Sequence, residues 1–201
     1  MDPDHILPII LALSGGIGFF LALRSRQKGG QKKVDELCQH LQGIGVKASV
    51  LEKVYQKRFG VRKPVGTIEL TGRNIDSINV HGVASQYGVK YFIDYLVRIS
   101  SFMGRGKKKK TKMVRKKTAA FGGKLVDVEW RGDDSLARGL NFDYQLKDKL
   151  LQADLGELKG DISIFPEPKH EYARIRTNYF LPASGLFEII DMIAGHIRSE
   201  W

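Results

Sequence analysis

Residues 66–99 read GTIELTGRNIDSINVHGVASQYGVKYFIDYLVRI and contain three consecutive strand patterns. Apolar and polar residues alternate over Gly66–Thr71 and again over Ser77–Ala84, with the period of a half-buried β-strand. The aromatic and β-branched run Tyr91–Ile99 predicts a third strand, although its apolar residues also fit the spacing of a helix. Strands that follow one another so directly indicate an antiparallel sheet.

The sequence on either side of this stretch predicts further strands and helices. Before it, Val34–Leu41 has helical spacing, with Cys38 on the apolar side, and Ala48–Phe59 offers a second helix. After it, strand and helix patterns alternate, and the chain finishes with an amphipathic helix. The expected elements there are a strand over Lys124–Trp130, a helix from Asp133 or Asp134 to Leu151 that breaks near Asn141, strands over Asp161–Phe165 and Glu171–Leu181, and a helix that Ser184 caps.

The N-terminal run Ile6–Leu23 holds 18 residues without a charge. A helix of that length covers about 27 Å, close to the hydrocarbon thickness of a bilayer, and therefore predicts a transmembrane helix. Asp2 and Asp4 precede the run and basic residues follow it, so the positive-inside rule places the body of the chain in the cytoplasm. The alternatives are a cleaved signal peptide, whose basic residues normally come first, and a buried helix of a soluble protein.

These patterns together predict a fold class and a domain organisation. The class is α+β, with one N-terminal transmembrane helix followed by a soluble domain that has a mainly antiparallel sheet and a C-terminal amphipathic helix. The predicted location is the cell (inner) membrane, crossed once. We expect a short extracytoplasmic N-terminus over residues 1–5, a transmembrane helix over 6–23, a basic juxtamembrane linker over 24–33 and a cytoplasmic α+β domain over 34–201.

Small residues recur every four positions within the predicted transmembrane helix, at Ser14, Gly18 and Ala22. Such a stripe lets two helices approach closely and predicts a homodimer formed through this face. The alternative is that glycine and alanine are simply common in membrane helices.

The net charge of +11 is concentrated in two clusters that contain no acidic residue. One follows the apolar run directly, and the other lies between residues 105 and 117. A domain that binds nucleic acid more often spreads its charge over a folded face. The first cluster comprises Arg24, Arg26, Lys28, Lys32 and Lys33, and the second comprises Arg105, Lys107, Lys108, Lys109, Lys110, Lys112, Arg115, Lys116 and Lys117.

The second cluster lies in a predicted flexible loop over residues 102–118, whose first part contains Gly104 and Gly106. Repulsion between its charges favours an extended, solvated loop. Beneath an anionic leaflet, each lysine or arginine near the surface gains about 1 kcal/mol. We therefore expect a binding or scaffold domain whose basic loop contacts anionic lipid headgroups. Nucleic acid, including ribosomal RNA, is the alternative polyanion, and a solvated loop without a partner is the third interpretation.

The spacing of the reactive residues assembles no catalytic or metal-binding set. Cys38 is the only cysteine, and none of the five histidines has the spacing of a zinc site. We therefore expect no cofactor and a non-enzymatic function. The alternative is an anchored enzyme or transport-complex subunit whose pocket gathers distant residues such as His81, His170 and Arg174. Arg174 and Arg176, which alternate along a predicted strand, form a second candidate site for an anion.

Overall fold

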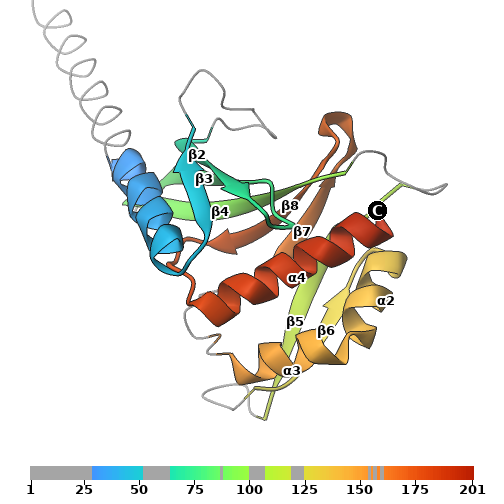
Figure 1. Cartoon of the computed structure of the whole chain (residues 1–201). Helices are drawn as coiled ribbons and strands as arrows, with labels where there is room; N and C mark the ends of the chain where they lie inside the picture. Colours follow the sequence, from blue (N-terminus) through green and yellow to red (C-terminus); the bar gives the residue numbers. More distant parts are fainter. Residues whose placement is uncertain are drawn as a thin grey trace, which may run out of the picture.

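Eight antiparallel strands form one sheet in the computed structural model of the chain, which describes residues 29–51, 64–86, 88–99, 107–118, 125–153, 155, 158 and 161–201. The strands lie in the order β1-β2-β3-β4-β8-β7-β5-β6 (Figure 1). Their bounds are Lys47–Val50 for β1, Gly66–Thr71 for β2, Ser77–Ser85 for β3, Gly88–Arg98 for β4, Thr111–Lys117 for β5, Leu125–Arg131 for β6, Ser163–Glu167 for β7 and Tyr172–Asn178 for β8.

Helices cover one face of this sheet (Figure 1). α4, Ser184–Glu200, crosses the sheet, while α2, Asp134–Phe142, and α3, Tyr144–Gln152, pack against both α4 and β6. Residues 29–43 are helical and pack against β2, and a short 3-10 helix, η3, spans Pro168–His170. The apolar stripe of α4 enters the core through Leu186, Phe187, Ile189, Ile190, Ile193, Ala194 and Ile197.

Two neighbouring cross-strand rows show why the two faces of the sheet differ. The first row belongs to the same core as the apolar stripe of α4, and all its side chains are 0% exposed. It consists of Ile68, Ile78, Tyr95, Ile175 and Ile164. One residue further along each strand, the pleat turns side chains to the opposite face. The row there is polar, and we call this surface the polar sheet face: Thr67, Asn79, Asp94, Arg176, Ser163 and Lys112.

At the start of α2, the carboxylate of Asp133 accepts hydrogen bonds from three segments of the chain. Asp133 caps the helix because its side chain accepts a hydrogen bond from the backbone N–H of Leu136, as expected for an N-cap aspartate. The same carboxylate accepts the backbone N–H of Lys109 at 3.1 Å and the indole N–H of Trp201 at 3.2 Å. The segment that leads into β5 and the C-terminal end of α4 therefore meet at this point.

Several predicted elements are confirmed. β2 has the predicted bounds, and residues 34–41 are helical with Cys38 buried. The helix after Asp133 is interrupted as expected, at Asp143, which ends α2 and caps α3 by accepting the backbone N–H of Leu146 at 2.9 Å. α4 begins at Ser184, but its N-cap position is Ala183, so no side chain caps it.

One predicted loop and one predicted helix contain strands instead. The described part of the basic loop contains β5, because Thr111 and Met113 alternate with exposed Lys112 and enter the core at 0% exposure. The predicted helix Ala48–Phe59 is wrong at its start, where β1 pairs with β2 as an edge strand. Residues 52–59 lie outside the described residues. Conversely, residues 29–33 of the predicted linker are helical.

The predicted fold class requires a correction. Among the residues that the structure describes, no helix is long and apolar enough to cross a membrane. The fold class with a transmembrane helix is therefore wrong as stated, and the architecture found is α+β with an antiparallel sheet and a C-terminal helix. The run Ile6–Leu23 and the predicted contact residues Ser14, Gly18 and Ala22 lie outside the described residues.

Candidate functional site

The nine basic residues predicted to contact an anionic surface are placed at the β5 side of the sheet, apart from Arg105, which lies outside the described residues. Lys107 to Lys110 lead into β5, and the other four lie in the strand itself. Exposed side chains predominate in this segment: Lys107, Lys109, Lys110, Lys112, Lys116 and Lys117. The fold therefore presents most of the cluster to solvent.

Three members of the cluster already have partners within the fold. Lys116 lies 3.1 Å from carboxylates of both Asp127 and Glu129 on β6. Arg115 donates to the backbone carbonyl of Leu155 at 3.3 Å. Lys108 donates to the carbonyl of Glu200 at 3.3 Å, where the helix dipole of α4 favours a cation. The charges of these three residues support the structure.

The remaining lysines of the cluster have no ion-pair partner in the part of the chain that the structure describes. Among the described residues, no carboxylate forms an ion pair with Lys107, Lys109, Lys110, Lys112 or Lys117, and we call these five residues the lysine segment. Lys112 stands on the polar sheet face, opposite Ser163, which in turn is opposite Arg176. Lys110 lies 4.6 Å from the centre of the Phe165 ring. The lysine segment thus borders the polar sheet face.

A buried charge network occupies the middle of that face. Asp94 is 0% exposed, and the guanidinium of Arg176 donates two hydrogen bonds to its carboxylate, of 2.6 and 2.7 Å. Arg174 donates to the same carboxylate at 3.1 Å and also pairs with Glu167 at 2.6 Å. His81 Nε2 lies 3.2 Å from Asp94 Oδ2. We call these five residues the Asp94 network.

The ionised form of Asp94 is stabilised by its neighbours. Burial by itself raises the pKa of this carboxyl, but the hydrogen bond from Arg176 and the adjacent His81 outweigh burial and hold the pKa below its ordinary value. Truncating one partner of such a buried pair leaves a charge without compensation. The network is consequently an internal support of the sheet.

We expect this support to weaken in acid. Because the pKa of Asp94 is lower in the folded state than its unfolded value of about 3.9, Asp94 stabilises the fold above about pH 4, and this contribution is lost as the pH falls through the folded pKa. Urea unfolding measured at several pH values between about 6 and 2 should show a steeper loss of stability for the wild type than for Asp94→Asn. Equal slopes in the two proteins would contradict the assignment.

Arg174 and Arg176, the second candidate site for an anion, both form ion pairs with Asp94 in the described structure. Arg174 is only 9% exposed, and both guanidinium groups face Asp94. Both also lie against the Phe165 ring, at 4.8 and 5.6 Å. Of the pocket suggested by the sequence, His81 and Arg174 meet at Asp94, whereas His170 is exposed in η3.

The sequence analysis missed Asp94, the centre of the network. A signal was present, because Asp94 is the one acidic residue in the otherwise apolar and aromatic run Tyr91–Val97. A lone carboxylate inside such a strand requires a partner when the strand is buried. Its partners could not be read from spacing, since Arg174 and Arg176 are 80 and 82 residues away.

The predicted juxtamembrane residues are only partly described. Arg24, Arg26 and Lys28 lie outside the described residues. Lys32 and Lys33 belong to the helix of residues 29–43, where Lys33 pairs with Glu36 at 2.7 Å and lies 4.7 Å from the ring of Tyr179. Lys33 therefore helps to hold this helix against the sheet.

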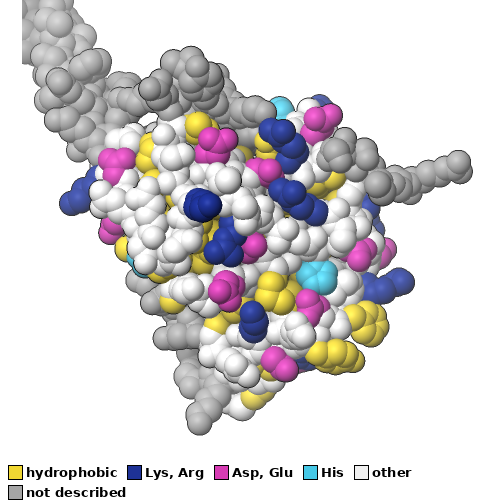
Figure 2. Space-filling model, viewed as in Figure 1, with side chains coloured by type: hydrophobic (Ala, Val, Ile, Leu, Met, Phe, Trp, Pro, Cys, Tyr) yellow, Lys and Arg dark blue, Asp and Glu magenta, His cyan; other side chains and the backbone are white. Residues whose placement is uncertain are grey.

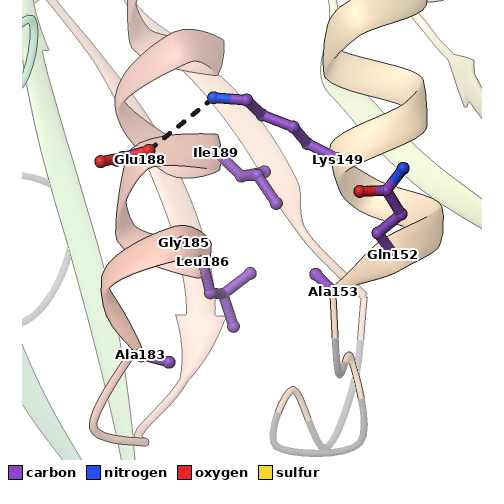
Figure 3. A pocket seen from close by; sticks show the side chains of 8 residues that line it. All are labelled: Lys149, Gln152, Ala153, Ala183, Gly185, Leu186, Glu188 and Ile189. Carbon is purple, nitrogen blue, oxygen red and sulfur yellow. Dashed lines mark ion pairs between the residues drawn. The ribbon is translucent and has the colours of Figure 1, made fainter.

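A cavity of about 330 Å³ on the helix side of the molecule offers little chemistry. It lies between α3 and α4, with Leu186 and Ile189 inside and a single ion pair of 3.7 Å between Lys149 and Glu188 at its rim (Figure 3). The surrounding surface carries cations and anions interspersed, without a large patch of one sign in this view (Figure 2). Among the described residues visible in this view, no cluster of one sign is comparable to the lysine segment.

Two features of the described residues thus stand out, the Asp94 network and the lysine segment. The charged groups of the Asp94 network pair with one another, whereas the exposed lysines of the lysine segment form no ion pair among the described residues. Comparison with known proteins adds no family to this description, because no family model, no curated protein and no solved structure matches the chain.

Proposed function

We propose that this protein is a non-catalytic binding domain that contacts anionic lipid headgroups through its lysine segment. The observation that carries the proposal is the set of five lysines without an ion pair among the described residues, next to Arg115 and Lys116, which do have partners. A fold that neutralises some cations of a cluster and leaves their neighbours exposed retains charge for an external partner.

The strength of such a contact follows from simple electrostatics. Each lysine close to an anionic membrane surface gains about 1 kcal/mol, and the gain decays within about 8–10 Å at physiological salt. Five lysines therefore supply up to about 5 kcal/mol, near the 4.1 kcal/mol of a millimolar complex. We expect weak, reversible binding that depends strongly on salt and on the density of anionic lipid.

A lipid surface fits the lysine segment better than RNA does. Sequence-tolerant binding of single-stranded RNA commonly uses aromatic rings on which bases stack. The Phe165 ring, which lies against Lys110 of the segment, also has Arg174 and Arg176 close by, all three within 4.6 to 5.6 Å of its centre. A stacked base would have to displace these cations, whereas headgroup phosphates need only approach the exposed ammonium groups.

The test compares two triple variants of the full chain that remove the same charge. Lys107→Ser, Lys109→Ser and Lys112→Ser alter the lysine segment, and Lys47→Ser, Lys149→Ser and Lys169→Ser alter exposed lysines elsewhere. Three lost contacts of about 1 kcal/mol each should lower partitioning onto phosphatidylserine-containing vesicles by about a hundredfold for the first variant. The second variant should stay close to the wild type.

The comparison uses the excess of binding to anionic over neutral phosphatidylcholine vesicles, so that any apolar contribution cancels. Equal losses in the two triple variants would contradict the proposal, since the position of the lysines would then be irrelevant. A gel shift with RNA at near-physiological salt that is abolished only in the first variant, without any anionic-vesicle excess in the wild type, would assign the segment to RNA instead.

A further inference from the structure

One cross-strand row of the polar sheet face places a short hydroxyl side chain between two long cationic ones. Ser163 on β7 lies directly opposite Lys112 on β5 and, on its other side, directly opposite Arg176 on β8. Directly opposed residues have Cβ atoms about 4.5–5.5 Å apart, so the three side chains leave the sheet side by side. Because serine is much shorter than lysine and arginine, the row leaves room above Ser163 with a cation on each side.

Each of these three side chains keeps a hydrogen-bond donor. Arg176 donates to Asp94 through Nε and Nη2, while its Nη1 makes no hydrogen bond to another described residue and 35% of its side chain is exposed. The half-buried Ser163 hydroxyl and the exposed Lys112 ammonium group also have no hydrogen-bond partner in the described part of the chain. Three donors from three strands therefore lie within reach of one position above Ser163.

The acidic side chains that border the row do not cancel its positive charge, because each has a basic partner within the fold. These pairs are Asp94 with Arg176, Glu167 with Arg174, Glu129 with Arg131 and Asp161 with Arg115. Lys110, two residues before Lys112, adds a second cation without an ion pair among the described residues and lies 4.6 Å from the centre of the Phe165 ring. Phe165 is itself two residues from Ser163 on β7. The site thus offers the charges of two lysines.

We infer that this row binds a phosphomonoester, a phosphate group joined to its carrier through one oxygen. Such a group carries about −1.5 to −2 charges near pH 7 and has three terminal acceptor oxygens, which match the two lysine charges and the three donors. A phosphodiester or a carboxylate has a single charge and fewer free oxygens, so it leaves part of the site unused. The inference rests on the proposed lipid contact, since Lys110 and Lys112 belong to the lysine segment, and it names the headgroup chemistry that the segment prefers.

Vesicles that contain phosphatidic acid, a lipid phosphomonoester, test this preference against phosphatidylserine vesicles adjusted to the same electrophoretic mobility. Equal mobility matches the surface potential, so a difference in the partitioning of the full chain reports the headgroup. We expect the wild type to partition at least about tenfold more strongly onto phosphatidic acid, and Ser163→Ala to lose about tenfold of this preference, the effect of one hydrogen bond to a charged group. Ser163→Ala removes no charge, so its partitioning onto phosphatidylserine should stay at the wild-type level.

Ser49→Ala is the matched control, because Ser49 is exposed on β1 at the other end of the sheet. It should keep the wild-type preference. The inference is overturned, with the lipid contact intact, if the wild type partitions equally onto the two anionic vesicles, if Ser163→Ala keeps the full preference, or if Ser49→Ala loses as much of it.

Glycerol 3-phosphate separates a soluble phosphomonoester from a lipid one. Suppose that the wild type shows no excess of binding to either anionic vesicle over neutral ones, so that the lipid contact fails. Calorimetric binding of glycerol 3-phosphate that Ser163→Ala weakens by about tenfold would then support the phosphomonoester site with a soluble ligand. No binding of glycerol 3-phosphate at millimolar concentration in that case would overturn the site as well.

Discussion

Replacing Asp94 with asparagine should lower the free energy of unfolding by about 3–5 kcal/mol, the usual cost of breaking a buried ion pair on one side. Asparagine has nearly the same shape, so the cavity term is small and the loss of charge dominates. Arg176, Arg174 and His81 would then face a neutral group inside the sheet. Urea unfolding followed by circular dichroism measures the change as a shift of the midpoint at unchanged slope.

The matched control for this prediction is Asp148→Asn on α3. Asp148 is exposed, and surface substitutions of this kind usually change stability by less than about 0.5 kcal/mol. If Asp94→Asn were as mild as Asp148→Asn, the five-residue network would not hold β4 and β8 together as described, and the polar sheet face would have to be stabilised in another way.

Replacing Gly132 with alanine should be similarly severe. Gly132 joins β6 to α2 with a φ of +144°, a conformation that side chains rarely adopt. An added Cβ would also meet the carbonyl oxygen of Lys110 and come within 2.6 Å of the Cα of Thr111. Backbone strain and overpacking together cost about 2–5 kcal/mol. The free energy of unfolding measures this loss, and the clash would also displace the start of β5, where the lysine segment lies.

The same substitution at Gly185 provides the contrast. Gly185 lies in the first turn of α4, and an added Cβ there meets nothing within 4 Å. Alanine restricts the unfolded chain and favours the helix, so Gly185→Ala should stabilise the protein by about 0.5–1 kcal/mol. A Gly132→Ala variant as stable as the wild type would show that the approach of Gly132 to the Lys110–Thr111 backbone is not tight.

The sheet could be predicted where one side of each strand is apolar and the other polar. β2 and β3 carry that alternation, with Ile68 and Ile78 on the helix side of the sheet and Thr67 and Asn79 on the polar sheet face, where both are also buried. The short connections between these strands also made their antiparallel order predictable, since consecutive strands usually lie side by side. Local pattern and final structure agree there.

β5 and β1 were not predicted, for opposite reasons. In β5 most residues are basic, so the sequence suggests a solvated loop. The alternation that indicates a strand depends on only two residues that enter the core, Thr111 and Met113. In β1, the apolar residues happen to fit a helical spacing, but pairing with β2 determines the backbone of this exposed edge strand. A strand that depends on its neighbour for hydrogen bonds carries a weak signal in its own sequence.

The candidate sites divide in the same way. The lysine segment is a local feature of the sequence and was predicted, although only the fold shows that Lys108, Arg115 and Lys116 have partners while their neighbours do not. The Asp94 network and the row of Lys112, Ser163 and Arg176 depend on contacts between strands that are far apart in the chain, and no pattern within one segment encodes them.

The lipid contact can be located directly with a fluorescent probe attached to one residue at a time. Cys38 is the only cysteine, it is buried, and burial raises the pKa of its thiol, so a probe reacts selectively with a cysteine introduced by Lys112→Cys or, as a control on η3, Lys169→Cys. Adding anionic vesicles at low salt should shift the emission of the probe at position 112 and leave position 169 unchanged. A shift at 169 with none at 112 would contradict the account.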